Sequence, residues 1–177
     1  MGSFSTMSSQ LSKLINEKYE LGKALKSKEL DALQAQINPH FLYNSLNMIS
    51  CMAIKNSVPE IGKSITQLSK FYKLSLNKGR DLLSIKDEIE HVSLYCSIQN
   101  SRYENKINLI VNVDTEVHKF YILKLLLQPI VENSILHGIL EKDNREGKIE
   151  ITVRKLNNSI IFIIEDDGIG ISKEMTE

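Results

Sequence analysis

The first fifty residues carry apolar side chains at the spacing of a coiled coil. Thirteen positions from Leu11 to Ala53 follow alternating steps of three and four, and all except Lys18, Lys28 and Pro39 are leucine, isoleucine or alanine. Such a seam predicts a long helix that packs against a partner helix. Pro59 ends it near Asn56, because the residue before a proline avoids the α region and proline starts a helix well.

A second amphipathic helix follows at once. Apolar residues from Ile61 to Leu76 recur at helical spacing, and Gly79 supplies a C-cap. Two helices cannot enclose a core by themselves, so we expect this hairpin to pair with a second copy as a four-helix bundle. The alternative is that the hairpin packs against the rest of its own chain.

The second half of the sequence alternates between helical and strand patterns. A third helix is predicted from Ser84, with Asp87 as its capping-box partner, to near Tyr103. A strand over 107–113, a helix over about 122–139 and two strands over 148–155 and 159–166 complete a two-layer α/β unit. The fold class is therefore α+β, with a helical part at 1–80 and an α/β part at 81–177.

Composition excludes several classes of protein. Lys and Arg total 22 and are balanced by 22 acidic residues, so no basic excess indicates direct nucleic-acid binding. Two cysteines are too few for a disulfide framework and too far apart for a metal knuckle. No uncharged apolar run reaches the roughly 18 residues of a membrane span, so the chain itself is expected to be soluble.

One polar strip lies on the first helix. His40 and Asn44 are four residues apart and share a face that is offset from the apolar seam. An exposed helical histidine is usually a plain surface residue. Pro39 beside it raises the case for function, because a proline inside a helix costs about 3 kcal/mol. His91 and His118 are expected to be ordinary surface residues.

Two further polar groups occur in the α/β part. Glu132, Asn133 and His137 lie close together on the predicted fourth helix, where an amide oxygen beside a carboxylate and an imidazole suits a hydrated Mg²⁺ that carries phosphates. The alternative is a polar cluster at a helix end. Asp166 to Gly170 reads Asp-Asp-Gly-Ile-Gly at the end of a buried strand, a pattern that also occurs in ordinary loops.

Taken together, the three groups resemble the LytS/YesM-type sensor histidine kinases, in the YesM-like branch. The resemblance rests on Leu33 to Asn47 (LQAQINPHFLYNSLN), Leu127 to Gly138 (LQPIVENSILHG) and Asp166 to Gly170 (DDGIG), and it covers roughly residues 28 to 172. It implies a dimerisation hairpin followed by an ATP-binding domain of the histidine kinase/gyrase/Hsp90 type.

The resemblance implies that His40 accepts the γ-phosphoryl group of ATP. Imidazole suits this role because a useful fraction of it is neutral near pH 7. Phe41 stands where other histidine kinases carry an acid, so the group that deprotonates His40 is unassigned. By geometry and by analogy with other kinase families, Asn44 would orient a water that removes phosphate from the regulator; the alternative for Asn44 is a packing role.

The resemblance assigns the remaining roles to the α/β part. Asn133 would hold Mg²⁺, Glu132 would act near the attacking site or orient water, and His137 would contact phosphate. Positioning and charge neutralisation of this kind are what phosphoryl transfer mainly requires.

The third motif, Asp166 to Gly170, would form the binding site of the adenine base. Asp166 would accept a hydrogen bond from the adenine amino group, while Gly168 and Gly170 let the backbone pass close to the base. In the family, a flexible lid and a second glycine-rich box follow this motif. The sequence ends at Glu177 before either, so we expect a truncated chain that dimerises but is catalytically silent.

The leading hypothesis is a protein-histidine kinase that uses ATP and Mg²⁺. It would pass phosphate to an aspartate in the receiver domain of a response regulator of AraC or LytTR type. It would be the cytoplasmic portion of a bacterial membrane protein. The rival is a non-catalytic coiled-coil dimerisation or phosphotransfer module with a degenerate ATP domain. A third reading, an ATPase without a phosphorylated histidine, is weakened by the long seam and the Pro39-His40 block.

Overall fold

The computed structural model describes residues 17–19, 21–23, 25–26, 38–76, 80–104 and 106–170. By its internal contacts the chain divides into two units, residues 1–39 and 40–177. The described residues between 17 and 26 are helical. Most of the predicted seam before Pro39 lies outside the described residues, and the predicted division near residue 80 stays a prediction.

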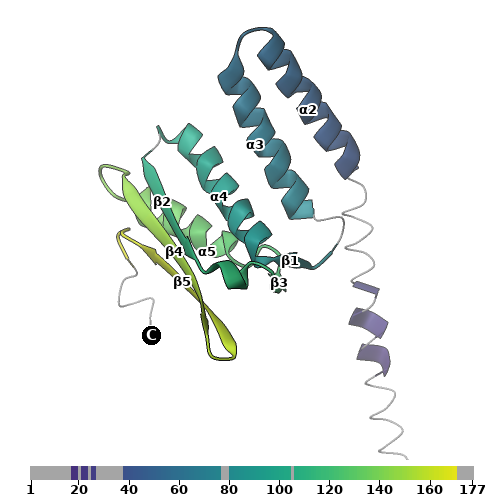
Figure 1. The fold of residues 1–177 in the computed structure, drawn as a ribbon, viewed down its shortest axis with the longest axis vertical. Helices are drawn as coiled ribbons and strands as arrows, with labels where there is room; N and C mark the ends of the chain where they lie inside the picture. The colour runs from purple at the N-terminus through teal and green to yellow at the C-terminus, as the bar shows by residue number, and fades with distance from the viewer. Residues whose placement is uncertain are drawn as a thin grey trace, which may run out of the picture. The chain divides into compact units, whose positions relative to one another are not determined.

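A helical hairpin opens the second unit. Helix α2 (Pro39–Lys55) and helix α3 (Pro59–Leu76) run side by side around a tight turn (Figure 1). Their closest approach uses small residues: the Ser50 hydroxyl donates to the Gly62 carbonyl at 2.9 Å, and a Cβ on Gly62 would lie 2.9 Å from an Ile54 side-chain carbon. The predicted hairpin is therefore present.

Pro39 has a different place from the predicted one. Asn38 is not helical and Pro39 is the first residue of α2. At a helix start the missing backbone N–H of proline costs nothing, because the first four N–H groups of a helix have no intrahelical partner. The prediction that Pro39 lies inside a helix, at a cost in stability, was therefore wrong.

The α/β part is built around one three-stranded sheet. Strands β2 (Ile107–Val113) and β4 (Gly147–Leu156) are parallel, and β5 (Ser159–Asp166) is antiparallel to β4. Helix α4 (Ile85–Arg102), capped by Ser84 as predicted, lies along the sheet (Figure 1). The core forms between them from fully buried aliphatic side chains of the sheet and of the helical segments, including Val92, Val131, Ile135, Ile149, Ile151 and Val153.

The predicted helix over 122–139 is only partly helical. Its first residues form β3 (Tyr121–Leu123), which pairs with β1 (Leu82–Ser84). A turn with Leu125 at φ 59° follows, and helix α5 (Gln128–Asn133) continues as a π-helix, Ser134–Ile139. The prediction failed because this leucine-rich stretch has helical composition, whereas its strand partner lies about forty residues earlier in the chain.

His91 is not the surface residue expected from the sequence. It is fully buried, its ring stacks on Phe71 with centroids 4.5 Å apart, and its Nε2 lies 2.7 Å from the Ser75 hydroxyl. Since that hydroxyl donates its one proton to the Phe71 carbonyl, Nε2 of His91 is the donor. Nδ1 has no hydrogen-bond partner among the described residues. Helix α3 covers this face of α4, which the sequence pattern of α4 alone could not show.

Burial of His91 predicts an acid-sensitive fold. Burial lowers the pKa of His91 from 6.5 to about 4. As pH falls through this interval the unfolded chain binds the proton first, so the free energy of unfolding decreases from about pH 6.5 to about pH 4 and this contribution then levels off. We expect His91→Phe, which keeps a ring on Phe71 but titrates no proton, to flatten the slope. Urea unfolding of both proteins at a series of pH values measures it, and equal slopes would contradict the prediction.

No helix among the described residues is long and apolar enough to cross a bilayer.

Candidate functional site

His40 lies in the first turn of α2 and is exposed. The amide nitrogen of Asn44 lies 3.1 Å from its Nδ1. An amide nitrogen can only donate, so Nδ1 accepts here and the neutral ring carries its proton on Nε2. Phe41 beside it is 71% exposed. The structure thus joins the two predicted residues of this strip as a hydrogen-bonded pair.

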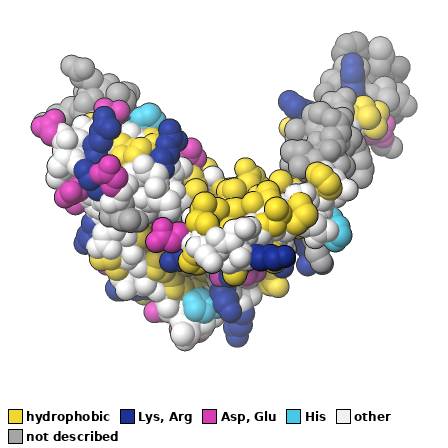
Figure 2. Space-filling view, turned by 90° about the horizontal axis from the view of Figure 1, so that it is seen from above, with side chains coloured by type: hydrophobic (Ala, Val, Ile, Leu, Met, Phe, Trp, Pro, Cys, Tyr) yellow, Lys and Arg dark blue, Asp and Glu magenta, His cyan; other side chains and the backbone are white. Residues whose placement is uncertain are grey.

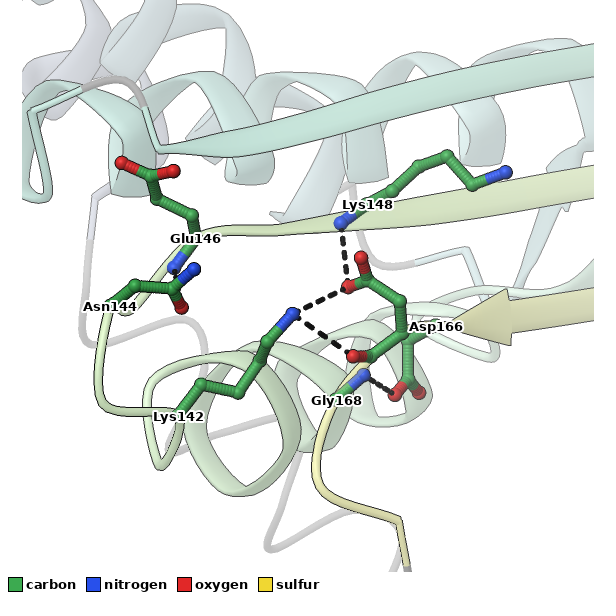
Figure 3. Close-up of polar contacts among 7 residues, drawn as sticks. Lys142, Asn144, Glu146, Lys148, Asp166 and Gly168 are labelled. Atoms are coloured by element: carbon green, nitrogen blue, oxygen red, sulfur yellow. Dashed lines mark hydrogen bonds and ion pairs between the residues drawn. The ribbon is translucent and has the colours of Figure 1, made fainter.

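Asp166, the last residue of β5, is held by two donors. The Ser134 hydroxyl donates to Oδ2 at 2.7 Å. The Gly168 backbone N–H donates to Oδ1 at 3.0 Å, as Figure 3 shows. Each carboxylate oxygen therefore has one donor and retains a further acceptor site. The carboxylate is exposed and is available to a ligand that donates a hydrogen bond.

The loop after Asp166 meets the π-helix backbone to backbone. A Cβ on Gly168 would lie 2.5 Å from the Gly138 Cα, a distance that no side chain tolerates. The Ile169 N–H donates to the Gly138 carbonyl at 3.2 Å. Gly170 has φ 74°, in the left-handed region that favours glycine. Gly168 is thus required by its close approach to Gly138 and Gly170 is favoured by its positive φ, whereas their role beside a base stays a prediction.

Asp167 fastens the same loop to two other elements. Its Oδ1 accepts from the Lys148 backbone N–H at 2.8 Å and lies 3.4 Å from Lys142 Nζ, which also donates to its carbonyl (Figure 3). The backbone hydrogen bond from Lys148, together with the nearby Lys142 ammonium, lowers the pKa of Asp167. Asp167 therefore ties the loop after β5 to β4 through Lys148 and to the segment after the π-helix through Lys142.

An open cavity adjoins this loop. Its volume is about 530 Å³, and it is lined by Glu141, Lys142, Asp143, Asn144 and the exposed Ile169. Four of its five lining side chains are charged or amide groups, and the fifth, Ile169, is apolar.

The predicted phosphate and metal residues lie at the end of α5, where Glu132 and Asn133 stand, and within the π-helix, which contains His137. Asn133 and His137 are exposed, Glu132 is half-buried, and in the part of the chain that the structure describes the Asn133 side chain makes no hydrogen bond. The described residues contain no cluster of three or more His, Cys, Asp or Glu side chains able to hold a metal. Mg²⁺ bound to a nucleotide needs few protein ligands, because it keeps waters and takes phosphate oxygens. The single exposed amide oxygen of Asn133 fits that requirement.

The sequence interpretation missed Ser134 and Lys142. Both contact the Asp166–Ile169 loop, as Gly138 does. Ser134 stands between the polar pair Glu132-Asn133 and the apolar pair Ile135-Leu136, and only the long-range pairing with Asp166 distinguishes it. His40 and Asn44 lie on α2, and no contact joins them to this loop among the described residues.

Comparison with known proteins gives consistent matches. A family model described as histidine kinase matches residues 28–107. Sensor histidine kinase YesM of Bacillus subtilis is 35% identical over 174 residues, which are 98% of this chain and 30% of that protein. Sensor protein LytS of Bacillus cereus is 32% identical over 174 residues, covering 94% of this chain and 29% of that protein. The chain thus spans less than a third of the length of these relatives.

One solved structure overlaps much of the chain. It is a histidine kinase domain from the blue-light activated histidine kinase of Erythrobacter litoralis EL346, with a TM-score of 0.41, 15% identity, and coverage of 84% of this chain and 75% of that one.

Proposed function

The chain belongs to the histidine kinase family and resembles its LytS/YesM members, and from this premise we propose that it transfers the γ-phosphoryl group of ATP to His40 and then to an aspartate of a response regulator. The observation that supports ATP use best is the position of Asp166, whose two oxygens are held by Ser134 and Gly168 at the start of the loop whose Ile169 lines an open cavity.

In the proposed nucleotide site, Asp166 accepts a hydrogen bond from the adenine amino group. Gly168 keeps the loop close against Gly138, and Gly170 leaves room for the base, since open space surrounds it. Asn133 holds Mg²⁺ and His137 contacts phosphate; Mg²⁺ supplies neutralisation of the charge that builds up on the phosphate oxygens. Glu132 acts near the attacking site or orients water.

In the transfer step, a lone pair of the neutral His40 ring attacks the γ-phosphorus. The N–P bond forms as the P–O bond to ADP breaks, and ADP leaves with the bonding electrons. Asn44 suits both neutral forms of the ring. Its N–H donates to Nδ1 when Nδ1 carries no proton. After a half-turn of the amide, its oxygen accepts from a protonated Nδ1, and the lone pair of Nε2 is then free to attack. The ring proton passes to water after transfer. A carboxylate oxygen of the regulator then attacks phosphorus, and the N–P bond breaks.

The hairpin supports a dimer in this proposal. Phe41, Met48, Met52, Ile54 and Ile61 are each more than half exposed. Figure 2, a view onto the α2–α3 end of the molecule, shows hydrophobic side chains gathered in one patch. Burial of such a surface favours association, and a second copy of the hairpin would complete a four-helix bundle.

In this proposal the chain serves a membrane-anchored sensor. Asn44 also orients water for removal of phosphate from the regulator.

The role of Asp166 is tested by Asp166→Asn. The variant keeps the size of the side chain but loses its charge, and charge-assisted hydrogen bonds contribute about 1.5–3 kcal/mol, so the Kd for ATP should rise about tenfold or more. The measurement is calorimetric titration of the full-length protein with Mg-ATP. Glu60→Gln changes an exposed acid on α3, outside this cavity; it is the control and should leave the Kd unchanged. Equal affinity of Asp166→Asn and the unaltered protein would refute the proposed adenine-binding site.

A further inference from the structure

Ser134 combines burial with a contact to an exposed charge. Its residue is 7% exposed, yet its hydroxyl donates at 2.7 Å to Oδ2 of Asp166, a carboxylate on the surface that faces a ligand in the proposed function. The other oxygen, Oδ1, accepts from the Gly168 N–H at 3.0 Å. The two donors come from different elements, the π-helix and the loop after β5.

We propose that Ser134 is a positioning residue that sets the base specificity of the nucleotide site by fixing the carboxylate plane of Asp166. This inference rests on the proposed function, in which Asp166 accepts a hydrogen bond from the base. Ser134 itself does not touch the nucleotide and acts through Asp166.

The physical argument starts from the freedom of an aspartate side chain. Its terminal torsion has a broad, roughly two-fold profile, so one donor on one oxygen leaves the plane of the carboxylate poorly defined. A donor on each oxygen fixes that plane and occupies one acceptor site per oxygen. The remaining acceptor sites then have a constant direction. A 6-amino purine donates to such an acceptor, whereas a 6-oxo purine places a second lone pair against it.

Loss of the Ser134 donor therefore has an asymmetric effect. The 6-amino base loses a well-placed acceptor, because the carboxylate can turn away from it. The 6-oxo base loses nothing, and it can even gain from a carboxylate that turns. Sites built to hydrogen-bond one partner discriminate strongly against an analogue that leaves the polar group unpaired.

The π-helix explains why this serine reaches Asp166. In the π-helix the Leu140 N–H donates to the Ile135 carbonyl, five residues back, at 2.9 Å. Gly138 lies on the same turn, and a Cβ there would stand 3.1 Å from Asp166 Oδ1. The absence of that side chain lets the turn approach the carboxylate, with Ser134 on Oδ2 and Gly138 close to Oδ1. Single π-helical turns inside α-helices are rare and occur frequently at functional sites.

The test compares ADP with inosine diphosphate, which carries a 6-oxo group in place of the 6-amino group. Calorimetric titration of the full-length protein gives the ratio of the two Kd values. In Ser134→Ala we expect the Kd for ADP to rise about tenfold, the size of one charge-assisted hydrogen bond, with the Kd for inosine diphosphate unchanged. Ser134→Thr keeps the hydroxyl and should restore most of the preference for ADP.

Two control variants separate positioning from a structural effect. Ser134→Cys is close in size but is a weak donor, so it should behave like Ser134→Ala. Ser93→Ala removes a hydroxyl that bonds to the Ile89 carbonyl in its own helix, and it should change neither Kd. A general loss of packing at Ser134 would weaken both nucleotides together and leave their ratio unchanged.

The outcomes distinguish this inference from the proposed function. If Asp166→Asn removes the preference for ADP and Ser134→Ala retains it, Ser134 does not set specificity, and the inference is overturned while the adenine-binding site stands. If the unaltered protein binds both nucleotides equally or binds neither, the proposed function fails and the inference fails with it. A lower ratio in Ser134→Ala and Ser134→Cys, restored in Ser134→Thr, supports the inference.

Discussion

We expect His40→Gln to abolish phosphorylation of the full-length protein. Glutamine has a similar length and polarity, but its amide nitrogen has no available lone pair with which to attack phosphorus. Since His40 is exposed in the first turn of α2, the substitution should leave the fold intact. The measurement is the acid-labile, alkali-stable label that remains on the protein after incubation with radioactive Mg-ATP.

The control for this experiment must be a histidine outside the core. His118→Gln suits it, because His118 is half-buried in the turn after the short 3₁₀ helix Thr115–Val117, and this variant should label normally. His91→Gln would be a poor control, because the buried ring of His91 stacks on Phe71 and its loss would disturb α4 against α3. Full labelling of His40→Gln would place the phosphate on another residue and contradict the assignment.

Local signals in the sequence predicted the elements whose partners are close in the chain. Ser84 caps α4 and bonds to the Asp87 N–H at 3.1 Å, because the two partners are three residues apart. Strands β4 and β5 were predicted as a pair because the turn at Asn157 and Asn158 joins them directly. The class of fold, helices followed by an α/β layer, followed from the same signals.

Distant partners were not predictable from the same patterns. Strand β3 pairs with β1, whose residues precede it by about forty positions, and its sequence Tyr121–Leu123 resembles the helical run that follows. The position of Ser134 opposite Asp166 depends on a π-helix and on the end of β5, neither of which periodicity marks. The motif containing Asp166 and Gly168 could be singled out, whereas Ser134, the distant residue that holds Asp166, could not.

Glu88 is the clearest residue of this second kind. It lies three residues after Ile85 and four before Val92 on α4, and it is fully buried. Its two carboxylate oxygens accept from backbone N–H groups of the turn before α5: Oε2 from Leu125 at 3.1 Å and Oε1 from Leu127 at 2.9 Å. Leu127 is the N-cap of α5, so Glu88 fixes the point at which the helix that carries Glu132 and Asn133 begins.

Replacement of Glu88 should therefore cost more stability than that of any exposed acid. Glu88→Ala removes both acceptors, and since each unpaired buried donor costs about 1–3 kcal/mol, we expect the free energy of unfolding to fall by about 3 kcal/mol. Glu88→Gln keeps one acceptor but turns an NH₂ group toward the other N–H, so its loss should be smaller. Urea unfolding measures both variants.

The matched control is Glu90→Ala, on the same helix. Glu90 forms a surface ion pair with Lys70, and exposed pairs of this kind contribute about 0.2–1 kcal/mol. Equal losses in Glu88→Ala and Glu90→Ala would show that the buried hydrogen bonds add nothing. Glu88 holds the start of α5, and a shift of Leu127 would move Asn133, the proposed metal ligand, at the other end of the same helix. The milder Glu88→Gln should therefore also weaken Mg-ATP binding in protein that is still folded. Glu90→Ala should bind Mg-ATP normally.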